Sequence, residues 1–273
     1  MLNKTHSWVL GRTVDGPLDA QREWIKKHFY DVPQIIIEKL ALLGIDLKNK
    51  VVLDFGCGDS IIDFGVIEIA NPKKLIATDI GSETLNESRR RISHMLGDVL
   101  NFSDKILRIQ NTNFNIPIEP SSVDVAFSWS TFEHVKFPLE GLKELRRVIR
   151  QNGILFIQIF PMYYSSYGHH MWWDTNFPRF FHLKHPWLFK YRLKRFYNSD
   201  KYTETFKQVI KEEVESLNKI RAREIKQILI ELDFNILYEN FRPDVYPNKS
   251  HFSWRSTKEF DCDELYIICQ KVG

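Results

Sequence analysis

The chain has 273 residues, of which 43% are hydrophobic, and this length suits one α/β domain, with or without an inserted cap. Its formal net charge of +3 is too small to indicate nucleic acid as a partner. The three cysteines fit no metal-ligand spacing and imply no disulfide framework, so a reducing, cytoplasmic setting is expected. No apolar run approaches the roughly 20 residues of a membrane span, and we expect neither a span nor a signal peptide.

After polar residues 1–16, helical periodicity appears over 17–29 and again over 33–43, with Asp31 as the expected N-cap of the second helix. Apolar runs typical of buried strands then alternate with helical segments. The strands expected from these runs are 48–55, 75–79, 106–110, 123–128 and 154–160. The helices expected between them are 61–70, 83–95 with Ser82 as its cap, and 138–150. The closing elements are a helix over 222–232 and strands over 235–242 and 265–271. This alternation predicts a parallel, doubly wound sheet, in which ligands bind beyond the carboxyl ends of the strands.

A glycine-containing turn follows the first expected strand. Asp54 stands near the end of that strand, and Gly56 and Gly58 form a turn without side chains, where backbone can approach a ligand closely. A second acidic residue, Asp79, ends the next strand, about one βαβ unit later. Ile61 stands where a dehydrogenase would have the third glycine of G-x-G-x-x-G, which argues against a dinucleotide site.

Residues 161–216 interrupt the alternation and are rich in aromatic residues, proline and histidine. Their simplest interpretation is a hydrophobic cap over the sheet, with a charged helix over 203–217. Because they follow strand five at the ligand-binding edge, we also expect them to form the wall of a second pocket. The candidate residues for that wall are Tyr163, Tyr164, His169, His170, Trp172 and Asp174.

Two other features of the insert have plainer interpretations. His182 and His185 could share one helix face, but no cysteine or Glu-x-x-His companion accompanies them, so no metal site is expected. The basic run over 184–201 is expected to be a solvated edge, with an anionic substrate group as the alternative. No nucleic-acid motif accompanies that run, and nucleic acid is not expected as a partner.

Five motifs in order over residues 50–160 resemble those of the class I S-adenosylmethionine-dependent methyltransferases. They are Val-Val-Leu-Asp-Phe-Gly-Cys-Gly at 51–58, Asp79, the segment 116–128, Phe-Glu-His-Val at 132–135, and the segment 144–155. The resemblance implies a Rossmann-like, seven-stranded, mostly parallel sheet with an aromatic-rich helical insert after strand five. It describes residues 1–273 as a single methyltransferase domain, with N-terminal helices in 1–45 and a cap at 161–216 over the acceptor.

The same resemblance implies S-adenosylmethionine as cofactor. The residues expected to bind it are Asp54, Phe55, Gly56, Cys57, Gly58, Asp79, Ile80, Thr112, Asn113 and Ser128. In this interpretation Asp54 meets the ammonium group and Asp79 accepts both ribose hydroxyls, although either could instead cap the helix that follows it. The chain departs from the family pattern in having Asp59 and Ser60 after the glycines and no acidic residue at the adenine position.

The family places the pair Glu133-His134 opposite the transferred methyl group. His134 is the expected general base, with His169 or His170 as alternatives, unless the pair only orders its loop. The expected reaction moves a methyl group to an O, N or C nucleophile on a small-molecule acceptor, such as a sugar, an aromatic compound or another secondary metabolite. The alternatives are a protein or RNA methyltransferase and a non-catalytic module that binds the cofactor. Ser-Trp-Ser-Thr at 128–131 replaces an Asn-Pro-Pro-Tyr motif, which argues against methylation of base amino groups.

Overall fold

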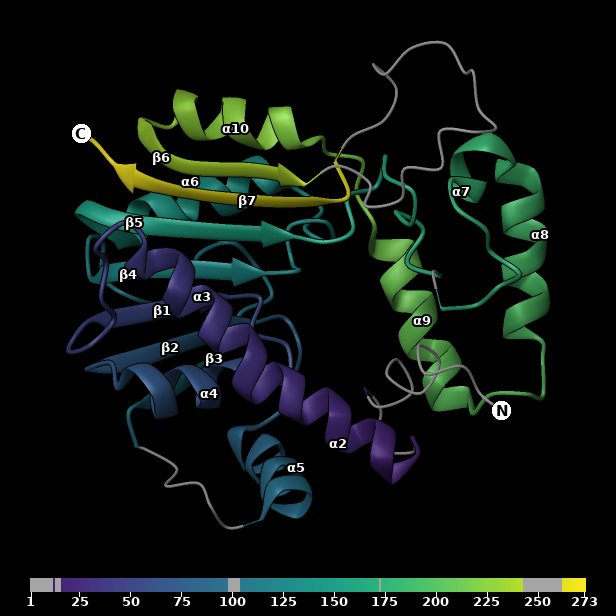
Figure 1. Ribbon diagram of the computed structural model, residues 1–273. Helices are drawn as coiled ribbons and strands as arrows, with labels where there is room; N and C mark the ends of the chain where they lie inside the picture. Colours follow the sequence, from purple (N-terminus) through teal and green to yellow (C-terminus); the bar gives the residue numbers. More distant parts are fainter. Residues whose placement is uncertain (1–11, 13–15, 98–103, 172, 243–261) are drawn as a thin grey trace.

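A seven-stranded sheet forms the centre of the molecule (Figure 1). The computed structural model describes residues 12, 16–97, 104–171, 173–242 and 262–273. The strands are β1 (Val51–Phe55), β2 (Lys74–Asp79), β3 (Ile106–Gln110), β4 (Val123–Trp129), β5 (Ile149–Ile159), β6 (Phe234–Arg242) and β7 (Glu264–Lys271). Their order is β3-β2-β1-β4-β5-β7-β6, and β7 runs antiparallel to both of its neighbours. This confirms the prediction of a doubly wound, mostly parallel sheet.

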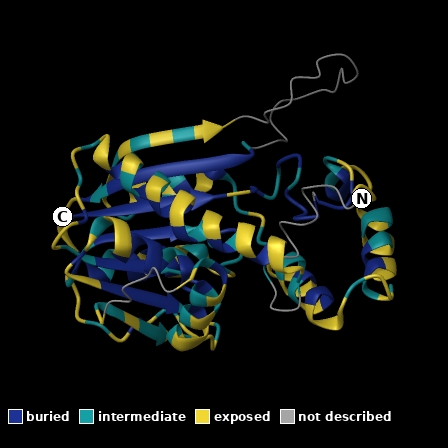
Figure 2. Cartoon of the chain, turned by 60° about the horizontal axis from the view of Figure 1, so that its bottom comes forward, coloured by how far each residue is buried: buried dark blue, intermediate teal, exposed yellow. Residues whose placement is uncertain are grey.

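Helices cover both faces of the sheet. The α-helices of the described residues, on the sheet and in the insert, are α2 (Leu18–Lys26), α3 (Val32–Ala41), α4 (Ile61–Ala70), α5 (Leu85–Leu96), α6 (Pro138–Val148), α7 (Phe181–Lys184), α8 (Pro186–Tyr197), α9 (Glu204–Ser216) and α10 (Ala222–Glu231). Helices α6 and α10 pack on one face through a cluster that includes Leu53, whereas α3 and α4 pack on the other through a cluster that includes Val52. Successive strand residues therefore enter opposite layers, which is why the central strands are apolar throughout and buried (Figure 2).

Two local predictions about helix starts were wrong. Asp31 does not cap a new helix, because α2 continues through a π-helical turn, Lys27–Asp31, directly into α3. The helix after β2 is capped by Thr84, not Ser82. Thr84 accepts a hydrogen bond from the amide of Glu87, whose carboxylate accepts one in return from the Thr84 amide. Ser82 lacks such a partner three residues later, because Leu85 stands there.

The insert between β5 and α10 forms a separate cap with its own apolar core. Its buried side chains are Met171, Trp173, Phe177, Phe181, Leu193, Phe196, Phe206 and Ile210. Helices α7, α8 and α9 lie beyond the carboxyl ends of β1, β4 and β5, the edge at which doubly wound sheets bind their ligands (Figure 1). Across the described ranges, no helix combines the length and apolarity needed to cross a membrane.

Candidate active site

Hydrogen bonds to neighbouring segments of the sheet fix the conformation of the turn after β1. The amides of Gly56 and Cys57 both donate to the carbonyl of Thr78, at 2.8 and 3.0 Å, and the Thr78 hydroxyl donates back to the Asp54 carbonyl. Thr131 donates to the Gly56 carbonyl from the loop after β4. Gly56 has φ of +83°, and a Cβ there would lie 2.1 Å from Cγ2 of Thr131, so this position requires glycine.

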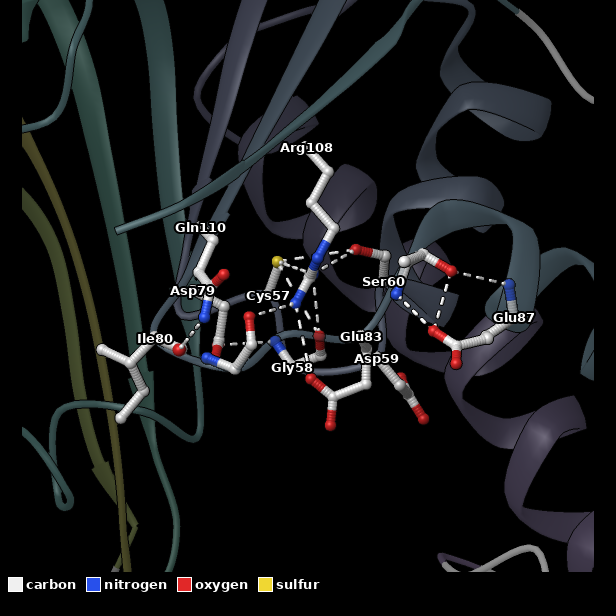
Figure 3. Close-up of polar contacts among 12 residues, drawn as sticks. Cys57, Gly58, Asp59, Ser60, Asp79, Ile80, Glu83, Glu87, Arg108 and Gln110 are labelled. Carbon is white, nitrogen blue, oxygen red and sulfur yellow. Dashed lines mark hydrogen bonds and ion pairs between the residues drawn. The ribbon is translucent and has the colours of Figure 1, made fainter. Parts of the chain in front are cut away.

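Asp79 faces this turn from the end of β2. One carboxylate oxygen accepts from the amide of Gly58 at 2.8 Å, and the other accepts from the amide of Gly81 at 2.7 Å (Figure 3). Because a carboxylate has about four acceptor sites, each oxygen retains capacity for a ligand hydroxyl. The next residue, Ile80, has 74% of its surface exposed and offers an apolar side chain beside the carboxylate.

The structure adds Arg108 of β3 to this region, a residue that the sequence interpretation missed. Its guanidinium donates to Cys57 Sγ, the Gly58 carbonyl, Ser60 Oγ and the Gly81 carbonyl (Figure 3). One side chain therefore ties the turn after β1 to the turn after β2. The sequence showed an arginine inside an expected strand. That its side chain extends past β2 to the turn after β1 could not be predicted without the strand order β3-β2-β1.

A pair of buried carboxyl groups lies behind the glycine turn. Asp54 is 1% exposed, and Asp63 on α4 is fully buried. Burial, followed by the nearby Asp63, raises the pKa of Asp54 well above its usual range. Burial likewise raises the pKa of Asp63 to about 7. Oδ1 of Asp54 accepts no hydrogen bond from the described chain, so the pair can share a proton or receive a cationic group. Asp63 was not among the predicted site residues. An acidic residue in the otherwise apolar first turn of a helix could have pointed to it.

A second cluster lies where the loop after β4 meets the cap. Glu133 is 2% exposed, while His134 is partly buried and has its Nδ1 2.8 Å from the hydroxyl oxygen of Ser216. The ring of His134 meets that of His170 edge to face, with centroids 5.0 Å apart. Burial, with a smaller contribution from His170, lowers the pKa of His134 to about 3, so its imidazole is neutral.

Within the cap, His170 is held in place by a carboxylate that also forms an ion pair. Glu213 on α9 lies 2.7 Å from Arg12 and 3.3 Å from Nδ1 of His170. Burial alone would raise the pKa of Glu213, but the charge of Arg12 and the hydrogen bond of His170 hold it well below its usual range. His170 itself has φ of +58°, a left-handed conformation that is uncommon for a residue other than glycine.

The structure brings together His134 and His170 but places His169 elsewhere. His169 is 1% exposed within the cap, 3.3 Å from the Pro178 carbonyl and edge to face with His182. Burial and the nearby His182 lower its pKa to about 3.

The remaining cofactor candidates lie along the same edge of the sheet. Ser128 donates to the carbonyl of Phe55 and so joins β4 to the end of β1. Thr112 and Asn113 are exposed in the loop after β3, where Asn113 accepts from the amide of Asn115. Thr112 and Asn113 are therefore accessible to a ligand, whereas the Ser128 hydroxyl is occupied by the backbone.

The residues predicted to line the acceptor pocket do not share one environment. Tyr163 and Tyr164 pack on the segment before α10, beneath the cations of Lys219 and Arg221, respectively. Asp174 is buried and accepts two hydrogen bonds from Asn176, one from its amide and one from its side chain. Trp172 lies outside the described residues.

Residues 53–157 match the model of a methyltransferase domain. Two curated relatives match part of the chain. A 37.1 kDa protein in transposon TN4556 of Streptomyces fradiae is 29% identical over 127 residues, covering 43% of this chain and 32% of that protein. "Probable methyltransferase ltbC" of Aspergillus luteorubrus is 26% identical over 121 residues, covering 43% and 42%. The match thus spans less than half the length of each curated relative.

Solved structures share the fold. A chain from the complex between the Haloferax volcanii Trm112 methyltransferase activator and its methyltransferase superposes with a TM-score of 0.56 at 11% identity, covering 100% of both chains. A SAM-dependent methyltransferase from Aquifex aeolicus superposes with a TM-score of 0.51 at 15% identity, covering 90% of this chain and 93% of that one. The unpartnered Asp54 oxygen, the side-chain-free turn and the Asp79 carboxylate fit an ammonium group, a methionine chain and a ribose. The methyltransferase-domain match over residues 53–157, the strand order and the fold shared with SAM-dependent methyltransferases indicate a methyltransferase domain of the class I fold, and the residues of this turn fit S-adenosylmethionine as the cofactor.

Proposed function

We propose that the protein transfers the methyl group of S-adenosylmethionine to an O, N or C nucleophile on a small-molecule acceptor. The observation that carries this proposal is the position of the cap. It has its own apolar core, lies over the ligand-binding edge of the sheet, and meets the loop after β4 through His134 and His170. A cap that encloses this edge favours an acceptor small enough to lie beneath it.

The donor side of the reaction is assigned to the turns after β1 and β2. Backbone around Gly56 and Gly58 receives the methionine chain, Asp54 its ammonium group, and Asp79 the ribose hydroxyls. When bound, the cofactor supplies an electrophilic sulfonium methyl group. The protein contributes orientation and the exclusion of water, so that the acceptor atom is in line with the bond from sulfur to methyl.

The acceptor side is assigned to the cluster after β4 and to the cap. As the acceptor atom bonds to the methyl carbon and the carbon–sulfur bond breaks, an O–H or N–H acceptor loses a proton. Glu133 and His134 are the groups closest in sequence to β4 that can take it, and His170 lies beside them. Tyr163, Tyr164 and Asp174 are assigned to the walls and support of the pocket. His169 contacts the cap interior and is assigned to holding the cap together.

The experiment is a transfer of labelled methyl from S-adenosylmethionine into cell extract that has been divided by size. We expect the purified chain to bind the cofactor and its demethylated product, and to label the fraction below about 1 kDa, because an acceptor that lies beneath the cap must be small. Label confined to protein or RNA would overturn the small-molecule assignment. That result would favour the macromolecular alternative. Binding without any transfer would favour a non-catalytic module.

A further inference from the structure

Glu133 is buried, and its side chain has no hydrogen-bond partner among the described residues. It is 2% exposed, and neither of its oxygens accepts a hydrogen bond within the described part of the chain. The amides of Glu133 and Phe160 lie close enough to lower its pKa slightly, but burial dominates and raises that pKa well above its usual range. Buried carboxylates normally occur paired or bound to a metal, so a cationic or hydrogen-donating ligand would satisfy this side chain, which has neither among the described residues.

Two imidazoles beside Glu133 are oriented by partners of their own. Nδ1 of His134 lies 2.8 Å from Ser216 Oγ, and Nδ1 of His170 lies 3.3 Å from the carboxylate of Glu213. Because Glu213 is anionic beside Arg12, it favours the tautomer in which Nδ1 of His170 carries the proton. In that tautomer Nε2 is an unprotonated acceptor that can bind a metal ion, and its 3.4 Å contact with the Pro161 carbonyl would be a hydrogen bond only if Nε2 carried the proton instead.

This arrangement matches the outer shell of protein metal sites. Ligating histidines usually donate their second ring nitrogen to a carboxylate or another acceptor, which fixes the ring and its tautomer. One ligand atom from each of Glu133, His134 and His170 lies within 4.8 Å of the others. Around a tetrahedral ion with bonds of about 2.1 Å, neighbouring ligand atoms lie about 3.4 Å apart. The distances between the three ligand atoms would therefore have to shorten by about an ångström when the ion binds.

We infer that Glu133, His134 and His170 bind a divalent transition-metal ion between the loop after β4 and the cap. Two imidazoles and one carboxylate suit Zn²⁺, Co²⁺ or Fe²⁺ better than Mg²⁺ or Ca²⁺, which prefer oxygen ligands. No motif or spacing in the sequence predicts this site. Glu133 and His134 are adjacent, but His170 reaches them only because the cap folds back onto the edge of the sheet.

Three protein ligands leave at least one position of the ion open. If the proposed function holds, that position faces the acceptor, and an acceptor hydroxyl bound there would lose its proton more readily. This role rests on the proposed function, whereas binding of the ion does not, and the two can be tested separately.

The test uses the full chain, stripped with a chelator and titrated with Co²⁺ in the absence of cofactor. We expect one Co²⁺ per chain, visible absorption typical of a four- or five-coordinate ion, and displacement of Co²⁺ by Zn²⁺. Glu133→Gln and His170→Asn should each weaken Co²⁺ binding at least about 100-fold, because each removes a ligand. Asparagine is chosen because it tolerates the positive φ of residue 170.

The matched control is His94→Asn, which alters an exposed histidine on α5 and should leave Co²⁺ binding unchanged. Circular dichroism checks folding, and Glu133→Gln should unfold no more easily than the wild type because it removes an uncompensated buried carboxyl. No Co²⁺ or Zn²⁺ binding by the wild type, or unchanged affinity in either ligand variant, would overturn the inference. A parallel titration with S-adenosylhomocysteine tests the cofactor site, so failure of the metal site and failure of the proposed function give different results.

Discussion

Arg108 offers the sharpest test of how the cofactor turn is built. Its side chain is 8% exposed and makes four hydrogen bonds, three to the turn after β1 and one to the turn after β2. Replacing it with methionine preserves length and apolar packing but removes every donor. We expect Arg108→Met to loosen both turns without disturbing the sheet beneath them.

The size of this effect follows from the number of bonds. A hydrogen bond from a charged donor contributes about 1.5–3 kcal/mol, but water can replace part of it at the exposed Gly58 carbonyl. We therefore expect a loss of about 3 kcal/mol in the free energy of unfolding. Cofactor binding must then order the loosened turns, at a cost of about 1.4–2.8 kcal/mol, which corresponds to a 10- to 100-fold weaker Kd.

The assay is calorimetric titration with S-adenosylhomocysteine, accompanied by urea unfolding. Arg90→Met is the matched control, since it makes the same change at an exposed position on α5. Arg108→Lys should be intermediate, because an ammonium keeps the charge but cannot reach both turns at once. A Kd for Arg108→Met within twofold of the wild type would refute the claim that this arginine preorganises the turn.

Three further results are expected. Asp79→Ala should weaken S-adenosylhomocysteine binding by about 2–3 kcal/mol, roughly 30- to 150-fold, in the same calorimetric assay, and a change below threefold would contradict a ribose contact. Asp63 holds its proton more tightly when folded, with a pKa of about 7, so its stabilising effect is complete below about pH 4 and disappears as the pH rises through 7. Urea unfolding should show wild type losing stability relative to Asp63→Asn over this range, by on the order of 3 kcal/mol, and parallel pH curves would contradict the acid pair. Phe206→Ala should lower the free energy of unfolding by about 3–4 kcal/mol, because it leaves a cavity in the apolar core of the cap, and should speed hydrogen exchange in α8 and α9. A matching loss of cofactor affinity would contradict the idea that the cap and the cofactor turn are independent.

Much of the sheet was readable from the sequence because its central strands are buried on both faces. Such strands appear as short apolar runs, and the runs expected at 48–55 and 75–79 correspond to β1 and β2; the edge strand β3, which is only partly buried, also lies at 106–110 as expected. The family resemblance implied a mostly parallel sheet, but the antiparallel placement of β7 between β5 and β6 was not predicted, since a strand's direction leaves no mark in its apolar pattern. Helix starts were less reliable because a cap depends on one local hydrogen bond, as Thr84 shows.

The residues proposed for the donor side could be selected from the sequence, because Asp54, Gly56, Gly58 and Asp79 lie at or directly after the ends of two expected strands. The residues that surround them could not, since they arrive from other elements. Arg108 reaches the glycine turn across β2, and its role depends on strand order.

The acceptor side depends still more on contacts between distant segments. His134 and His170 meet only when the cap folds back, and Glu213 then joins His170 from α9. No spacing in the sequence predicts these contacts. That is why His169 and His170 were equally good candidates in the sequence and have different surroundings in the fold.

The central claim is that one edge of the sheet holds the methyl donor on the turns after β1 and β2 and directs its methyl group toward the cap. A crystal structure with S-adenosylhomocysteine tests it most directly. We expect the ribose hydroxyls on the carboxylate of Asp79 and the sulfur facing Glu133, His134 and His170 beneath the cap. A cofactor bound away from Asp79, or one whose sulfur faces away from these three residues, would contradict the account.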